Sequence, residues 1–136
     1  ELIWTGTTAV ATGHRTNFAS SDAATKLVLN GHDRFSERPL TYFTQTQVWQ
    51  YHTGTPVTSD GTVNSAAISN ASVNEIAVYS FALKPEEHQP SGTCNFSRID
   101  NAELRITDND QALYIYAVNY NVLRIMSGMG GLAYSN

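Results

Sequence analysis

Four histidines, scattered acids and one cysteine are the residues of this sequence that could carry chemistry. A histidine close to a carboxylate can act as a general base, and several such side chains together can hold a metal ion. None of the histidines has a recognised ligand or triad spacing, so we expect structural or surface histidines and no catalytic, cofactor-binding or metal-binding residue. The four are His14, His32, His52 and His88.

Two further segments resemble ligand sites only superficially. Asp108-Asn109-Asp110 clusters oxygen ligands, but a calcium loop also needs alternating ligands, a glycine and a distant glutamate. Ser127 to Gly131 is glycine-rich, but no Lys-Ser or Lys-Thr follows it, as a phosphate-binding loop requires. We therefore predict a turn in the first segment and a bend in the second. Cys94 is the only cysteine, which excludes an internal disulfide and a zinc site of clustered cysteines.

Asparagine and aromatic side chains suggest contact with sugars. Asn70-Ala71-Ser72 and Asn95-Phe96-Ser97 both fit the glycosylation triplet, and Asn70 is the more plausible acceptor because it falls in a predicted loop. Tryptophan and tyrosine rings can stack on sugars, although we expect most of them to be core or interface anchors.

Composition favours a single all-β domain. The 136 residues are enough for one core, only 15% are charged, and Thr, Ser, Asn and Tyr are abundant. The net charge is −4 and the eight Lys and Arg residues are dispersed, which disfavours direct nucleic-acid binding. No apolar run approaches the roughly 18 to 20 residues that cross a bilayer, so membrane insertion is not expected.

Alternating or continuous apolar runs, separated by turn residues, predict the strands of an antiparallel sandwich or barrel. We predict an extended segment over 41–51 because its apolar residues show no helical period. We also predict a hairpin in which 102–107 pairs with a strand from Leu113 to about Ile125. The other predicted strands are 1–4, 26–29 (closed by a turn at Asn30-Gly31), 75–83 and 132–134.

Residues at about 55–74 form an unusually long connection. They include Pro56, Asp60-Gly61 and many Ser, Thr, Asn and Ala residues. Connections of this length in a compact domain are usually functional, so we predict a long surface loop within the single domain 1–136.

The segment from Pro90 to Asn101, Pro-Ser-Gly-Thr-Cys-Asn-Phe-Ser-Arg-Ile-Asp-Asn, strongly resembles a signature of the major capsid proteins of nucleocytoplasmic large DNA viruses of the chlorella-virus and iridovirus type. Flanking segments agree in the same order, from Glu1-Leu2-Ile3-Trp4 to the glycine-rich C-terminus, so the resemblance spans nearly the whole chain. The signature residues that we single out are Pro90, Ser91, Gly92, Asn95, Phe96, Ser97, Arg98, Asp100 and Asn101.

This resemblance implies a structural, non-enzymatic subunit built of two successive jelly rolls. Three subunits form a pseudo-hexagonal capsomer in the outer icosahedral shell of the virion, which lies above an internal membrane and is assembled in the host cytoplasm. The implied partners are the homotrimer itself, neighbouring capsomers, minor capsid proteins and, through outward loops, the host surface. By family order the chain corresponds to the C-terminal part of the second jelly roll, and its start at Glu1 without a methionine also suggests a piece of a longer polypeptide.

For the signature we expect a structural role, in which Gly92 supplies a tight turn and Asn95, Ser97, Arg98 and Asp100 hydrogen-bond to fix an irregular crossing between strands. The length of segment 57–74 departs from the family's commoner pattern, in which the chain passes almost directly to the next strand. In a capsomer, such a loop is expected to point outward. Two other functions remain open from the residues alone. These are a carbohydrate-binding β-sandwich module and, with less support, a small jelly-roll enzyme of the cupin type.

Overall fold

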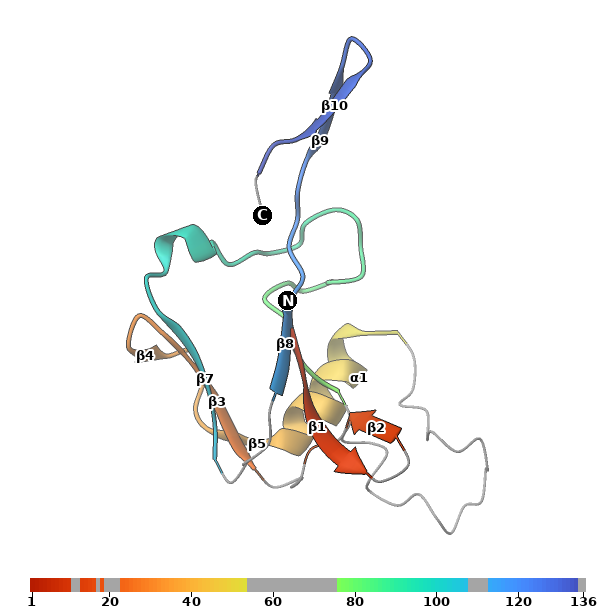
Figure 1. Ribbon diagram of the computed structural model, residues 1–136. Helices are drawn as coiled ribbons and strands as arrows, with labels where there is room; N and C mark the ends of the chain where they lie inside the picture. The colour runs from red at the N-terminus through yellow and green to blue at the C-terminus, as the bar shows by residue number, and fades with distance from the viewer. Residues whose placement is uncertain (11–12, 17, 19–22, 54–75, 108–112, 135–136) are drawn as a thin grey trace.

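The computed structural model describes residues 1–10, 13–16, 18, 23–53, 76–107 and 113–134 of the chain (Figure 1). Antiparallel strands dominate these residues, which confirms the predicted all-β class. The predicted loop at 55–74, with Asn70, and the predicted turn at Asp108 to Asp110 lie outside the described residues.

The first sheet is organised around β1 (Leu2–Val10), whose apolar and β-branched residues favour an extended backbone. Leu2 to Trp4 pair with β6 on one side, and Leu2 to Gly6 pair with β8 on the other. The later part of β1 pairs with β2. The three partner strands are β2 (Gly13–Thr16), β6 (Ala77–Tyr79) and β8 (Leu113–Ala117), all antiparallel to β1.

The second sheet is organised around β3 (Ala24–Leu29), and a separate hairpin follows near the C-terminus. Asn30 and Gly31 both have positive φ, of 51° and 78°, and form the predicted turn from β3 into β4. The partners of β3 are β4 (His32–Asp33), β5 (Arg38–Pro39) and β7 (Ala102–Ile106), and the hairpin consists of β9 (Leu123–Met126) and β10 (Met129–Leu132).

The segment after β5 is helical, so the prediction of an extended segment over 41–51 was wrong. A π-helical turn, η1 (Tyr42–Thr46), runs into a short α-helix, α1 (Gln47–Tyr51). The buried side chains of these two turns are Phe43, Thr44 and Gln47, at the one-, four- and three-residue spacings of a helical face. Two of the three are polar, so the apolar positions alone did not reveal this periodicity.

The predicted hairpin between β7 and β8 was also wrong. β7 pairs with β3, with Leu27 opposite Leu104, whereas β8 pairs with β1, with Trp4 opposite Ile115. The chain therefore changes sheets between β7 and β8. Alternating residues on both sides of a turn are equally compatible with a hairpin and with such a crossing, so the local pattern did not distinguish them.

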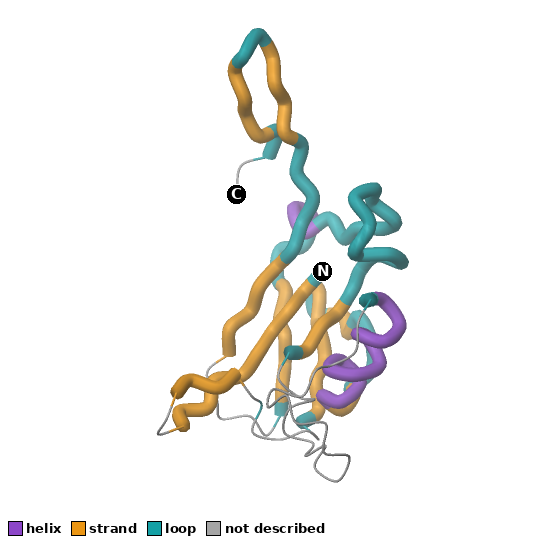
Figure 2. Tube along the Cα trace, turned by 90° about the vertical axis from the view of Figure 1, so that its right-hand side faces the viewer, coloured by secondary structure: helices purple, strands orange, loops and turns teal. Residues whose placement is uncertain are grey.

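The core lies where the two sheets and the helical segment meet (Figure 2). Trp4, Phe43 and Leu40 are almost completely buried, and the Trp4 and Phe43 rings pack at a centroid distance of 5.3 Å. Leu104 and Ile106 from β7 pack against the same cluster, which explains why β7 belongs next to β3. Ala77 and Val78 of β6 are both buried, so this strand is covered on both of its faces.

Candidate assembly surface

The signature segment begins with a closed turn after β6. The hydroxyl of Ser91 accepts a hydrogen bond from the Lys84 backbone N–H (2.8 Å) and donates one to the Lys84 carbonyl (3.2 Å). Gly92 has φ of 150°, and a Cβ there would lie 3.2 Å from the carbonyl oxygen of Phe81. Only glycine fits this backbone without strain.

The middle of the signature is a single 3-10 turn, η2 (Phe96–Arg98). Asn95 precedes it, and its side-chain oxygen accepts a hydrogen bond from the Ser97 backbone N–H at 3.0 Å. This is the local side chain to backbone bond that starts a helical turn. The ring of Phe96 packs edge-on against Phe81, with centroids 5.6 Å apart, and so connects the turn to the residues that follow β6.

Asn30, at the turn after β3, holds the end of the signature. Its side-chain oxygen accepts hydrogen bonds from the backbone N–H groups of Asp100 (2.8 Å) and Asn101 (3.2 Å), and its amide donates to the Arg98 carbonyl (3.5 Å). Its own backbone N–H donates to the carbonyl of Asn101 at 2.8 Å. The Asn30 side chain thus bonds to three backbone positions of the chain just before β7.

The charged side chains of the signature are less engaged. Arg98 and Asp100 are exposed, as is Pro90, and within the described residues no ion pair joins Arg98 to Asp100. Asn101 instead donates to Glu103 at 2.7 Å, and Arg105 pairs with the same carboxylate. Hydrogen bonds from Arg105 and then Asn101 lower the pKa of Glu103.

His52 lies between two carboxylates in a cluster that joins three parts of the chain. Its Nε2 is 2.5 Å from Glu1 at the start of β1, and its Nδ1 is 3.2 Å from Glu86 in the turn after β6. Glu86 also accepts hydrogen bonds from the backbone N–H and the hydroxyl of Thr53, and these bonds lower its pKa. Both ring nitrogens of His52 therefore contact carboxylates. Nothing in the sequence indicated that the side chains of Glu1 and His52 would be in contact.

The remaining sequence candidates are not brought together. His32 and His88 are exposed, and His14 lies in β2. Across the described ranges no group of three or more His, Cys, Asp or Glu side chains is arranged to hold a metal ion. Nor does any helix in that part of the chain have the length and hydropathy to cross a membrane.

Apolar side chains are exposed on both faces of β8. Tyr114, Ile115 and Tyr116 are consecutive, so they alternate between the two faces, and each is more than half exposed. Within the described residues β8 pairs only with β1, which leaves its other edge open. An open, apolar edge strand is a surface that pairs with other chains unless something covers it.

The β9–β10 hairpin has the same character. It projects from the two sheets in Figures 1 and 2, and Ser127 (φ 50°) and Gly128 (φ 79°) form its turn. The predicted bend over 127–131 is therefore confined to its first two residues, and the predicted terminal strand at 132–134 was misplaced, because Met129–Leu132 form β10. A two-stranded hairpin alone is marginally stable in water. Its large apolar side chains are all at least half exposed, namely Leu123, Ile125, Met126, Met129 and Leu132.

Antiparallel sheets with exposed apolar strands define the class of all-β proteins to which this chain belongs. Comparison with known proteins identifies the family: the family model described as large eukaryotic DNA virus major capsid protein matches residues 4–131. The chain therefore belongs to the major capsid protein family of large eukaryotic DNA viruses, whose members are structural proteins and not enzymes.

Curated relatives agree with this assignment. The chain is 55% identical over 120 residues to the major capsid protein of Pyramimonas orientalis virus, an alignment that covers 82% of the chain and 30% of that protein. It is 45% identical over 137 residues to the major capsid protein of Paramecium bursaria Chlorella virus 1, covering 82% and 28%. The chain thus spans about a third or less of the length of these relatives.

Solved structures support the same fold. VP54 of PBCV-1, as fitted into a reconstruction of the virophage Sputnik, matches with a TM-score of 0.70 and 33% identity, over 99% of this chain and 43% of that one. A quasi-atomic model of the PBCV-1 capsid matches with a TM-score of 0.67 and 31% identity. The predicted jelly-roll capsid fold is confirmed, and the alternative of a carbohydrate-binding module is not favoured.

Proposed function

We propose that this chain is the C-terminal portion of the second jelly roll of a double jelly-roll major capsid protein. With the rest of its polypeptide it forms one subunit of a homotrimeric, pseudo-hexagonal capsomer in the outer icosahedral shell of the virion. The observation that carries this proposal is the uncovered apolar surface of β8, β9 and β10, which a complete subunit would bury. The capsid proteins that the chain matches are much longer than this chain, and the corresponding additional residues would cover these strands.

The oligomeric state of the full-length protein tests the proposal. We expect a trimer by size-exclusion chromatography with light scattering. Ile115→Asp should reduce the yield of folded trimer strongly, because a carboxylate would be buried without a partner in the completed sandwich. Ile115→Leu is the matched control and should assemble normally. A monomeric full-length protein, or an Ile115→Asp variant with normal trimer yield, would contradict the proposal.

The signature segment fixes the irregular crossing between β6 and β7 in this proposal. The cap at Asn95 and the hydrogen bonds to Asn30 support this role. Arg98→Ala in the full-length protein tests whether the Arg98 side chain contributes to fixing this crossing. Unchanged folding and trimer yield would remove Arg98 from this role and leave it to the backbone contacts.

The segment at about 55–74 is the proposed outward loop, available for host contact or for a sugar on Asn70. Deleting it should leave trimers intact, and loss of trimers would argue against outward display. Glycopeptide mass spectrometry of virions tests Asn70. The further proposed partners are neighbouring capsomers and minor capsid proteins, with assembly in the host cytoplasm and without direct nucleic-acid binding or membrane insertion.

A further inference from the structure

The ring of His52 joins three segments that lie far apart in the sequence. His52 follows α1, and its backbone N–H donates to the Val48 carbonyl at 2.9 Å, so the last turn of the helix fixes its position. Glu1 reaches the ring from the start of β1, and Glu86 reaches it from the turn after β6. Glu1, His52 and Glu86 together form the His52 cluster.

The two contacts of the ring require more protons than a neutral histidine carries. Nδ1 lies 3.2 Å from one oxygen of Glu86, and Nε2 lies 2.5 Å from one oxygen of Glu1. A carboxylate oxygen only accepts hydrogen bonds, whereas a neutral imidazole has one N–H and one lone pair. In the neutral ring, one nitrogen would therefore direct its lone pair at a carboxylate oxygen, and the two would repel each other.

Glu86 is the partner that stays ionised. Its two oxygens accept hydrogen bonds from the hydroxyl (2.7 Å) and the backbone N–H (2.9 Å) of Thr53, and these bonds, together with the contact with His52, lower the pKa of Glu86. An ionised Glu86 cannot donate, so Nδ1 of His52 must carry a proton. The lone pair of a neutral His52 would then lie at Nε2 and face Glu1.

The contact between His52 and Glu1 is shielded from water. The two side chains are 19% and 12% exposed, and the two atoms in contact are buried. They are close but not aligned as a hydrogen bond, and neither has a hydrogen-bond partner elsewhere among the described residues. Charge attraction is therefore what can hold this contact, and a second proton on the His52 ring supplies it.

Other charged groups near the cluster do not replace this proton. Within the described residues Glu1 and Glu86 form ion pairs only with His52, while Lys84, in the same turn as Glu86, pairs with Glu87 at 3.1 Å. The α-amino group of Glu1 donates to a backbone carbonyl after β8, and burial lowers its pKa. In the longer polypeptide proposed above, this nitrogen is an uncharged amide.

We propose that the His52 cluster is a pH-sensitive switch: the protonated ring holds the end of α1 to the start of β1, and loss of one proton releases Glu1. Glu86 stays bound to the end of the helical segment through Thr53, so the part that opens is the contact between β1 and α1. The switch lies within one subunit and does not depend on the proposed assembly.

The direction of the pH effect follows from proton binding. Histidine in an unfolded chain loses its proton near about pH 6.5, whereas the folded cluster requires that proton. The stability that the switch contributes is therefore present at lower pH and is lost as the pH rises. This is the opposite direction to the effect of an ionised glutamate, whose contribution is lost as the pH falls.

Hydrogen exchange of the full-length protein, followed by mass spectrometry and corrected for the intrinsic pH dependence of exchange, tests the switch. Between about pH 6 and about pH 8.5, peptides from the start of β1 and the end of α1 should become several-fold less protected. Peptides from β3 and β7, which lie in the other sheet, should change much less. Unchanged protection at β1 and α1 in the wild type would overturn the inference.

Glu1→Gln is the decisive variant, because an amide can donate to the lone pair of a neutral His52 and so needs no second proton. Its protection at β1 and α1 should stay at the low-pH level of the wild type throughout this range. His52→Gln should lack the pH dependence, with the weaker protection of the high-pH wild type at both ends. His88→Gln is the matched control, since His88 is exposed, and should behave as the wild type.

A Glu1→Gln variant that loses protection with rising pH as the wild type does would overturn the inference, because the proton would then act elsewhere. If His52→Gln does not fold, the wild type and Glu1→Gln alone decide the question. A full-length protein that shows the switch but forms no trimers would contradict the proposed function and leave this inference intact.

Discussion

Asn30 combines two properties that are rarely needed at one position. Its backbone has a positive φ of 51°, and its side chain makes the bonds to Arg98, Asp100 and Asn101 that hold the signature against β3. Asparagine tolerates this conformation better than other non-glycine residues, and its short amide reaches the backbone. Substitutions can therefore separate the two contributions.

In the full-length protein, Asn30→Gly should lower the free energy of unfolding by about 1 kcal/mol, because the backbone conformation stays relaxed while the hydrogen bonds are lost. Asn30→Ala should lower it by about 2 kcal/mol, because the loss of the hydrogen bonds is joined by the strain of holding alanine, which has a Cβ, in the left-handed conformation. Chemical denaturation measures both. Equal costs for the two variants would show that backbone strain does not matter here.

Gly92 is the second residue whose identity follows from its backbone. Gly92→Ala should destabilise the protein by about 1–3 kcal/mol, since its φ of 150° is strained for alanine and the new Cβ would lie 3.2 Å from the Phe81 carbonyl oxygen. Gly130→Ala is the control, because nothing lies within 4 Å of a Cβ at that position. Thermal unfolding of the full-length variants should show a clear loss only for Gly92→Ala.

At the scale of elements, the His52 cluster connects the start of β1, the end of α1 and the turn after β6. The hydrogen bonds from Thr53 and the contact with His52 lower the pKa of Glu86 below its usual value of 4.5. A carboxylate whose pKa is lower in the folded state stabilises the fold above its unfolded pKa, and this contribution is lost as the pH falls through the folded pKa.

Glu86→Gln should therefore be less stable than the wild type near neutral pH, and the difference should shrink as the pH falls below about 4.5. Thermal unfolding of both proteins from about pH 7 to about pH 3 measures it. Glu87→Gln is the control, since among the described residues the Glu87 carboxylate forms only an exposed pair with Lys84, which contributes little. A Glu86 difference that is constant with pH would contradict this account.

Strands whose pattern is local could be predicted from sequence, and their pairing could not. The apolar runs that became β1, β3 and β6 and the turn at Asn30-Gly31 were identified because residue type alone favours them. The helical segment was missed because Thr44 and Gln47 form part of its buried face. The partners of β7 and β8 depend on β3 and β1, which lie far away along the chain.

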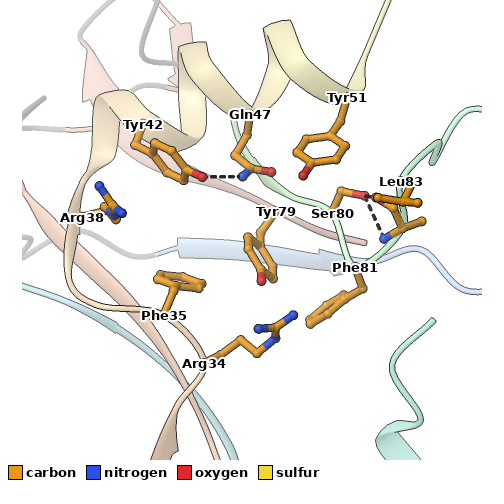
Figure 3. Close-up of a pocket in the computed structure, with 11 residues that line it drawn as sticks. Arg34, Phe35, Arg38, Tyr42, Gln47, Tyr51, Tyr79, Ser80, Phe81 and Leu83 are labelled. Atoms are coloured by element: carbon orange, nitrogen blue, oxygen red, sulfur yellow. Dashed lines mark hydrogen bonds between the residues drawn. The ribbon is translucent and has the colours of Figure 1, made fainter. Parts of the chain in front are cut away.

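The candidate sites divide in the same way. The signature was found because it is one continuous segment with a specific sequence. Its contact with Asn30 and the cluster of Glu1, His52 and Glu86 join residues between about thirty and seventy positions apart, and no short pattern encodes such contacts. The cavity between the helical segment and the end of β6 (Figure 3) was missed for the same reason, since its lining comes from two stretches of the chain, 34–51 and 79–83.

At the scale of the whole molecule, β8, β9 and β10 expose many large apolar side chains to water. Residues 1–136 produced alone should associate and bind a hydrophobic dye, whereas the full-length protein should bind much less dye for the same mass. Light scattering and dye fluorescence at matched concentration measure this. A dye-free, monodisperse fragment would show that β8, β9 and β10 find cover within these residues.

The pairing of β1 with β8 sets a lower limit on when this region can fold during translation. Leu2 lies opposite Ala117, so the central strand of the first sheet lacks one neighbour until more than a hundred further residues have left the ribosome. Until then Trp4 and the residues around it belong to a nascent chain with an unfinished core, and such chains are prone to aggregation. Cells that synthesise this protein in quantity should therefore depend on chaperones that bind nascent polypeptides late in its synthesis.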